Sequence, residues 1–227
     1  PIVIVAGDPK SVFLELYFKS LKKKKFKNPL ILIINERILL EQMKDLKYDF
    51  KLNKLDLNRL NFKNLNNKKI NVINVPFHKK FISEYIYESF EIALALIKKN
   101  NKINLINGPI NKKKILKRRY LGITEYLDFK TKSKGNTVML IYNKNLAVSP
   151  LTTHLPLKKV HKYINKQKII NHVKQISSFY KKKFNVVPKI GITGLNPHCE
   201  SNFYKSEEER IIAPTIEYLS KKKFKVS

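Results

Sequence analysis

Short apolar runs alternate with amphipathic stretches along this chain, and the alternation predicts an α/β fold. The apolar runs are rich in β-branched residues, as buried strands are, and span residues 2–6, 30–34, 70–75, 103–106, 138–142, 146–148 and 189–192. The stretches with helical spacing span residues 14–21, 36–44, 83–99, 157–179 (with a break) and 207–221. Elements in this order indicate a mostly parallel sheet with helices on both faces.

The clearest helix signals lie in residues 83–99 and just after Ser206. Apolar residues recur at helical spacing from Ile86 to Ile97. Ser206 precedes three glutamates, so it has the features of an N-cap followed by an acidic first turn. By contrast, residues 51–69 are rich in Asn and Lys and predict an exposed excursion with one weak strand.

Two subdomains are expected, because lysine and glycine cluster in residues 115–135, near the middle of the chain. We place the first α/β subdomain in residues 1–120 and the second in residues 121–227. The last residues, 223–227, have the pattern of a strand that is just beginning, which predicts further residues beyond Ser227. The second subdomain is therefore expected to lack its C-terminal part.

At 227 residues and 43% hydrophobic content, the chain can form a substantial core. Its longest apolar run, residues 30–34, is far too short to cross a bilayer, and the chain begins with a strand-like run instead of a signal peptide. The single cysteine, Cys199, excludes an internal disulfide and fits a reducing compartment. We therefore expect a globular cytoplasmic protein that does not enter the membrane.

The formal net charge of +30 suggests nucleic acid or an anionic membrane as a partner. However, 42 of the 47 basic residues are lysine and only five are arginine, the residue favoured for bidentate recognition of phosphate and bases. The lysines are also scattered in short runs near predicted helix ends and turns, where cations suit the helix dipole and the solvent. The composition therefore disfavours nucleic acid as a binding partner. It is consistent with a diffuse positive electrostatic field that attracts small anionic molecules.

Two histidines stand in the most informative segments. His154 follows the apolar run 146–148, and His198 follows the run 190–192. Imidazoles on loops at strand ends are well placed to bind a divalent metal, because a stiff sheet fixes their separation. A single loop histidine is more often a surface or structural residue, so each segment alone is a weak signal. The other three histidines are expected to be solvated or ordinary loop residues: His78, His161 and His172.

Five short motifs follow one another along nearly the whole chain. They are Gly7-Asp8-Pro9, Asn107-Gly108-Pro109-Ile110-Asn111-Lys112, Gly122-Ile123-Thr124-Glu125-Tyr126-Leu127, Thr152-Thr153-His154-Leu155-Pro156-Leu157 and Gly194-Leu195-Asn196-Pro197-His198. In this order they resemble the signature segments of the 4-hydroxythreonine-4-phosphate dehydrogenase family of vitamin B6 biosynthesis. The last two are similar to that family's metal-ligand segments.

The resemblance implies an isocitrate/isopropylmalate dehydrogenase-like fold and a homodimer with its active site in a cleft between two domains. It also implies oxidation of a small phosphorylated hydroxy amino acid by NAD or NADP, followed by decarboxylation to 3-amino-2-oxopropyl phosphate. None of the six glycines forms a G-x-G-x-x-G fingerprint or a P-loop. A nicotinamide cofactor would therefore bind without the usual Rossmann phosphate turn.

The resemblance also implies roles for three residues. The family's metal (zinc, magnesium or cobalt) has three histidine ligands, two of which correspond to His154 and His198. That metal would act as a Lewis acid that lowers the pKa of the alcohol and later stabilises the enolate. Thr124 matches a substrate-contacting position, where its hydroxyl can donate to a phosphate or carboxylate oxygen. Without the resemblance, Thr124 is equally well explained as a helix N-cap.

The chain departs from the family pattern at several points. Ile123 stands where the family has a substrate-contacting histidine, and isoleucine can neither hydrogen-bond a phosphate nor move a proton. Lys112 and Arg118 are candidate substitutes by charge alone. The third metal histidine and the family's later substrate and cofactor residues would lie beyond Ser227. Two imidazoles alone should hold a metal poorly.

Two other interpretations stay open. A catalytically impaired homologue that acts as a basic binding protein would fit Ile123 and the absence of a third histidine ligand. A related dehydrogenase or decarboxylase with a changed substrate would fit Ile123 as the mark of an altered pocket. The histidine segments of the last two motifs favour the metal-dependent dehydrogenase over the binding protein.

Overall fold

The computed structural model describes residues 1–227 except 112–119, 121, 134–135, 197 and 199–205. It divides into two compact units, Pro1–Glu125 and Tyr126–Ser227. The assignment of residues 1–120 and 121–227 to two subdomains stays a prediction. No described helix combines the length and the apolar composition that a bilayer-spanning segment requires.

The first unit is built on a parallel sheet with the strand order β3-β4-β2-β1-β5. Its strands are β1 (Ile2–Val5), β2 (Leu30–Ile34), β3 (Leu52–Lys54), β4 (Ile70–Asn74) and β5 (Asn104–Asn107). Its helical elements are α1 (Phe13–Lys23), α2 (Glu36–Asp45), η1 (Phe62–Asn64), η2 (Lys79–Phe81) and α3 (Ile82–Lys99), and α5 (Ile123–Lys130) crosses into the second unit. These elements confirm the predicted α/β fold.

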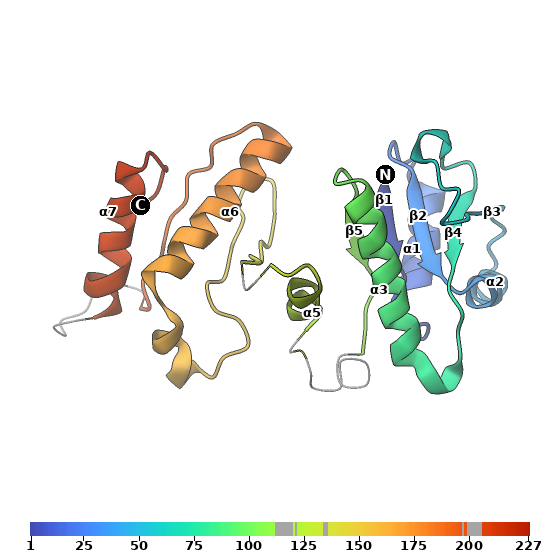
Figure 1. Ribbon diagram of the computed structural model, residues 1–227, viewed down its shortest axis with the longest axis horizontal. Helices are drawn as coiled ribbons and strands as arrows, with labels where there is room; N and C mark the ends of the chain where they lie inside the picture. The colour runs from blue at the N-terminus through green and yellow to red at the C-terminus, as the bar shows by residue number, and fades with distance from the viewer. Residues whose placement is uncertain (112–119, 121, 134–135, 197, 199–205) are drawn as a thin grey trace. The chain divides into compact units, whose positions relative to one another are not determined.

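Different helices cover the two faces of this sheet. On one face, Phe18 of α1 and Leu39 of α2 join Leu32 of β2 in a buried cluster. On the other face, α3 contacts β1 and β2, whose residues Val3 and Ile31 are fully buried. Figure 1 shows α1 and α3 on opposite sides of the sheet. Because β2 is buried on both faces, all five of its residues are apolar and the strand has no polar alternation.

The strand order changes direction at β1. From β1 the chain passes to β2, with β4 and β3 beyond it, whereas β5 pairs with the opposite side of β1. In open α/β sheets, ligands bind at such a switch, in the crevice outside the carboxyl ends of the strands. The loops that follow β1 and β5 are therefore the candidate ligand-binding loops of this unit.

The second unit is held together by an apolar cluster between helices. Its helical elements are η3 (Leu157–Tyr163), α6 (Lys166–Phe184), the π-helical turn η4 (Glu208–Ile212) and α7 (Ala213–Lys221). Ile169 and Val173 of α6 pack in this cluster with Leu219 of α7. The break predicted within residues 157–179 is confirmed, because η3 ends at Tyr163 and α6 begins at Lys166.

Three strands predicted for the second unit are wrong. A single antiparallel bridge, between Ile141 and Val148, joins residues 138–142 to residues 146–148. Residues 189–192 make a single parallel bridge, from Ile190 to Val226. Ile141 and Val148 are 62% and 54% exposed. A strand needs a hydrogen-bonding partner along its length, and a local apolar run carries no information about that partner.

Candidate active site

The loops after β1 and β5 meet at the carboxyl edge of the first unit's sheet. The backbone N–H of Asp8 donates to the Pro109 carbonyl oxygen at 2.8 Å, and the N–H of Gly108 donates to the carbonyl oxygen of the last residue of β1 at 2.8 Å. The Asp8 carboxylate accepts from the Lys10 N–H at 3.0 Å, which closes its own turn. These bonds fix the half-buried Asp8 and the exposed Asn107 at the switch in strand order.

Gly7 and Gly108 permit this close approach because neither carries a Cβ. Gly7 has a φ of +80°, and a Cβ there would lie 2.4 Å from the Pro109 carbonyl oxygen. A Cβ on Gly108 would lie 2.1 Å from the Ala6 carbonyl oxygen and 2.9 Å from Cγ of Phe13. The sequence predicts no site role for Asp8 or Asn107, although a Gly-Asp-Pro motif directly after a buried strand is a signal for one.

Thr124 lies at the start of α5, within its first turn. It is the second residue of the helix and half-buried, so the alternative explanation of Thr124 as the N-cap is wrong. Ile123, the first residue of α5, is also half-buried, and Gly122 before it is buried. Lys112 and Arg118, the candidate substitutes for the family histidine, lie outside the described residues.

His154 lies on an exposed loop of the second unit, with a backbone φ of +56°. Histidine is among the few side chains enriched in this left-handed region, and such conformations gather at functional sites. Leu151, three residues earlier, packs against the apolar cluster and so anchors the loop. The imidazole forms no hydrogen bond or ion pair with any described residue, so either ring nitrogen, in the matching tautomer, is available to bind a metal.

His198 is exposed in a turn closed by Asn196, whose Oδ1 accepts from the His198 N–H at 2.9 Å. Earlier in the same loop, the Leu195 N–H donates to Oε1 of Glu208 at 2.7 Å. Ile192, where the loop begins, packs against the same apolar cluster that anchors the other histidine loop. Both loops therefore leave one core, although no hydrogen bond joins the two imidazoles.

The two histidines offer a donor set that suits a divalent metal. A neutral ring nitrogen is a good ligand for zinc and similar ions, and neither imidazole is engaged by a described residue. Within the described ranges, no group of three or more His, Cys, Asp or Glu side chains could hold a metal ion. Among the described residues, His154 and His198 are therefore only candidate ligands, and a metal bound by both would need further ligands.

Glu208 fixes the His198 loop to the helical core. Glu208 is buried in η4, only 8% exposed, and its carboxylate accepts the Leu195 N–H. This hydrogen bond is the main cause that holds the pKa of Glu208 below its ordinary value. Ser206 caps the same helical segment, since its Oγ accepts from the Glu209 N–H at 3.2 Å, which confirms the predicted N-cap.

We expect the contribution of Glu208 to stability to be lost in acid. Its folded pKa lies below the ordinary 4.5, so the carboxylate stabilises the fold above pH 4.5, and this contribution falls as the pH drops through the folded pKa. Glu208→Gln should flatten this dependence and lower the free energy of unfolding at neutral pH by about 1 kcal/mol. Urea unfolding from about pH 3 to 7 measures both effects. Glu209→Gln, an exposed change in the same turn, should keep the wild-type profile; a Glu208→Gln profile identical to wild type would contradict the assignment.

The remaining histidines require one correction. His172, expected to be solvated, is half-buried in α6, with Nδ1 3.5 Å from the Ser149 Oγ. Burial, with a smaller effect of the Lys168 charge, lowers the pKa of His172, so this imidazole is neutral at physiological pH. The prediction missed this burial because Lys residues surround His172 in the sequence while its own side chain lies on the packed side of the helix. His78 and His161 are exposed, as expected.

Comparison with known proteins gives matches over most of the chain. The family model described as pyridoxal phosphate biosynthetic protein PdxA matches residues 25–227. A 4-hydroxythreonine-4-phosphate dehydrogenase of Aquifex aeolicus is 31% identical over 231 residues, covering 99% of this chain and 72% of that protein. A D-threonate 4-phosphate dehydrogenase of Pectobacterium atrosepticum is 30% identical over 104 residues, covering 45% of this chain and 32% of that protein.

Solved structures share the fold. The 4-hydroxythreonine-4-phosphate dehydrogenase of Klebsiella pneumoniae gives a TM-score of 0.82 at 23% identity, over 100% of this chain and 73% of that one. A putative enzyme of the same name from Salmonella typhimurium gives a TM-score of 0.83 at 24% identity, over 100% and 73% of the two chains. These likenesses confirm the expected dehydrogenase-like α/β fold.

Proposed function

Because the chain belongs to the PdxA family of pyridoxal phosphate biosynthetic proteins, we propose that it oxidises the secondary alcohol of 4-hydroxythreonine 4-phosphate with NAD or NADP. Loss of carbon dioxide from the resulting β-keto acid then gives 3-amino-2-oxopropyl phosphate. The Aquifex aeolicus relative carries this proposal, since it is named for that substrate and aligns with 99% of this chain. The chain is accordingly an oxidoreductase that acts on a CH–OH group.

His154 and His198 are proposed as two ligands of a divalent metal. Imidazole ligands favour zinc or cobalt over magnesium, which prefers oxygen. When bound, such an ion supplies a Lewis acid that lowers the pKa of the substrate hydroxyl. The chain's own contribution is to position both rings, through the Leu151 anchor of one loop and the Glu208 hydrogen bond of the other.

On the substrate side, we propose that Thr124 binds a phosphate or carboxylate oxygen. A hydroxyl in the first turn of a helix can donate to an anion that the helix N-terminus also attracts. The overall charge of +30 would raise the local concentration of such anionic substrates.

Ile123 supports a second candidate, a related dehydrogenase with a changed substrate. The Pectobacterium atrosepticum relative is named for D-threonate 4-phosphate, which carries a hydroxyl where 4-hydroxythreonine 4-phosphate carries an amino group. The apolar side chain of Ile123, at the position where the family has a substrate-contacting histidine, would weaken binding of 4-hydroxythreonine 4-phosphate. Both candidates share the metal, the nicotinamide cofactor and the oxidised alcohol.

Ile123→His separates the two candidates. In the 4-hydroxythreonine 4-phosphate enzyme, the new imidazole should lower KM for that substrate by roughly ten-fold, because a hydrogen bond to a charged group is worth about 1.5–3 kcal/mol. NADH or NADPH formation by the metal-loaded protein, with each substrate in turn, measures this. Ile123→Leu is the matched control and should leave KM unchanged. Faster turnover of D-threonate 4-phosphate than of 4-hydroxythreonine 4-phosphate would favour the second candidate. Turnover of neither substrate would favour the interpretation of the chain as a basic binding protein without catalytic activity.

Exposed apolar side chains of the second unit support the proposal of a homodimer. Ile141, Leu146 and Val148 are 62%, 72% and 54% exposed, and the Tyr142 ring stacks on Phe184 with 5.4 Å between centroids. Apolar surface of this kind often marks an interface, and sedimentation equilibrium tests whether a second copy covers it. The single cysteine supports a cytoplasmic location.

A further inference from the structure

A pocket of about 460 Å³ opens at the amino ends of β2 and β4 in the first unit, where Leu30 and Ile70 line it. It lies at the sheet edge opposite to the loops that follow β1 and β5. Cavities of this size commonly bind small molecules. The pocket is therefore separate from the candidate active-site loops of this unit.

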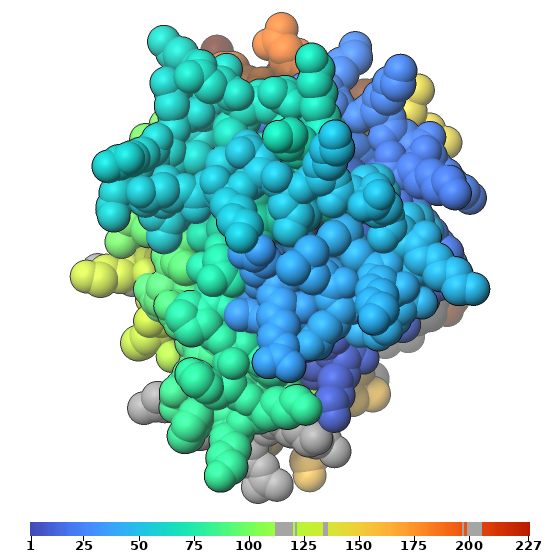
Figure 2. All heavy atoms as spheres, turned by 90° about the vertical axis from the view of Figure 1, so that its right-hand side faces the viewer, coloured from blue at the N-terminus to red at the C-terminus, as the bar shows by residue number. Residues whose placement is uncertain are grey.

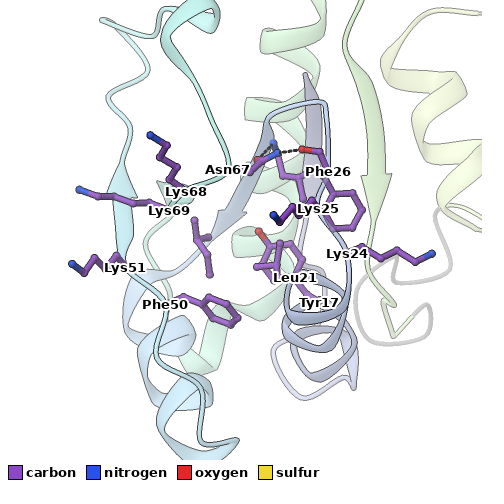
Figure 3. Close-up of a pocket in the computed structure, with 12 residues that line it drawn as sticks. Tyr17, Leu21, Lys24, Lys25, Phe26, Phe50, Lys51, Asn67, Lys68 and Lys69 are labelled. Atoms are coloured by element: carbon purple, nitrogen blue, oxygen red, sulfur yellow. Dashed lines mark hydrogen bonds between the residues drawn. The ribbon is translucent and has the colours of Figure 1, made fainter.

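The wall of the pocket is aromatic and contains a hydroxyl with no hydrogen-bond partner among the described residues, open to a ligand or to solvent. Phe26 and Phe50 line it together with Tyr17, which is only 7% exposed. The Tyr17 hydroxyl forms no hydrogen bond with any described residue, and Figure 3 shows its oxygen pointing into the pocket. Burial raises the pKa of this phenol well above its ordinary value, so the hydroxyl remains protonated and can donate.

Five of the twelve lining residues are lysines, and none is acidic. In the chain as a whole, Lys and Arg together make up only 47 of 227 residues. The ammonium groups pair with no described residue. Figure 3 shows the ammonium group of Lys25 over the pocket, while the other four side chains start at its rim and extend outward: Lys24, Lys51, Lys68 and Lys69. Unpaired cations beside a low-dielectric wall focus a positive potential.

The helix dipole accounts for only part of this cluster. It can explain Lys24 and Lys25, which follow the carboxyl end of α1. Lys51, Lys68 and Lys69 come from segments that precede β3 and β4, so no helix end requires them. Three separate parts of the chain converge to surround one aromatic cavity with positive charge (Figure 2 shows this side of the first unit).

We propose that this pocket binds an aromatic phosphomonoester, with the ring against Tyr17 and Phe50, the phosphate at the Lys25 ammonium group, and the rim lysines supplying a positive field around it. The Tyr17 hydroxyl would donate to the ligand and so gain the partner that the protein does not provide. The apolar wall favours a ligand with a ring over a free inorganic anion, because ring burial adds hydrophobic free energy.

Isothermal titration of the full chain with phenyl phosphate at low salt tests the proposal. We expect inorganic phosphate to bind at least roughly ten-fold more weakly. Tyr17→Phe keeps the ring and should reduce phenyl phosphate affinity roughly five-fold, and Lys25→Gln roughly three- to ten-fold. Lys22→Gln, an exposed change on α1 outside the lining, should have no effect.

Three results would overturn the proposal: equal affinity for the two phosphates, equal losses in the Lys22→Gln and Lys25→Gln variants, or no binding of phenyl phosphate. Thermal unfolding of each variant establishes that it is folded before binding is compared. None of these variants changes His154, His198 or Thr124, so all of them should keep the wild-type rate of dehydrogenase turnover.

Discussion

Gly108→Ala is expected to destabilise the protein by about 3 kcal/mol or more, at the upper end for overpacking. The new Cβ would lie 2.1 Å from the Ala6 carbonyl oxygen and 2.8 Å from its carbon, so the backbone of one strand end would have to move. Such a shift would also break the hydrogen bond from the Gly108 N–H to β1. Urea unfolding followed by circular dichroism measures the loss.

Gly191→Ala is the matched control for this substitution. A Cβ on Gly191 would meet no heavy atom within 4 Å, and its φ lies outside the left-handed region. Alanine there should be neutral or stabilising by about 0.4–1 kcal/mol, because it restricts the unfolded chain. If the Gly108→Ala variant unfolded at the same urea midpoint as the wild-type protein, the close packing of the loops after β1 and β5 would be contradicted.

The first unit could be predicted well because its signals are local. The run 30–34 is apolar throughout, which is what a strand buried on both faces requires, and the helical spacing of 83–99 matches the buried side of α3. Each of these patterns is complete within one element. The strand order, by contrast, pairs distant residues, up to about a hundred positions apart between β1 and β5, and no local pattern encodes it.

The second unit was predicted less well because its structure depends on distant partners. The run 146–148 has strand composition, yet Leu146 is 72% exposed and Val148 makes one bridge. Apolar composition predicts burial only where another element is present to provide it. The burial of His172 was missed for the same reason, since Ser149 lies on a different segment.

The candidate site shows the same division. Both histidine loops could be recognised from their residues, because Pro, Gly and Asn mark turns after short apolar runs. The positive φ of His154 and the burial of Glu208 could not be recognised from the sequence, because each depends on packing in the folded chain. The bond from Leu195 to Glu208 makes the position of His198 depend on a helix that begins after it in the chain.

His154→Asn and His198→Ala are each expected to weaken binding of zinc or cobalt by roughly 100-fold. Four-ligand zinc sites bind with about 10–16 kcal/mol, so one imidazole corresponds to about 3 kcal/mol. Asparagine is chosen at position 154 because it tolerates the left-handed φ of +56°, so the backbone is retained while the imidazole is lost. Competition with a coloured chelator measures zinc affinity, and visible absorption of the cobalt form reports its coordination.

One ion bound per chain, with a similar loss of affinity in each single variant, would be the signature of one shared ion, because both imidazoles then contribute to the same binding constant. His161→Ala removes an exposed imidazole of the same unit and should leave affinity unchanged. Two ions bound per chain, one of which disappears in each variant while the affinity for the other is unchanged, or a loss in His161→Ala as large as in the other two, would mean that the histidines bind metal separately as surface residues. In that case the metal assignment would fail, while the fold and the family membership would stand on their own observations.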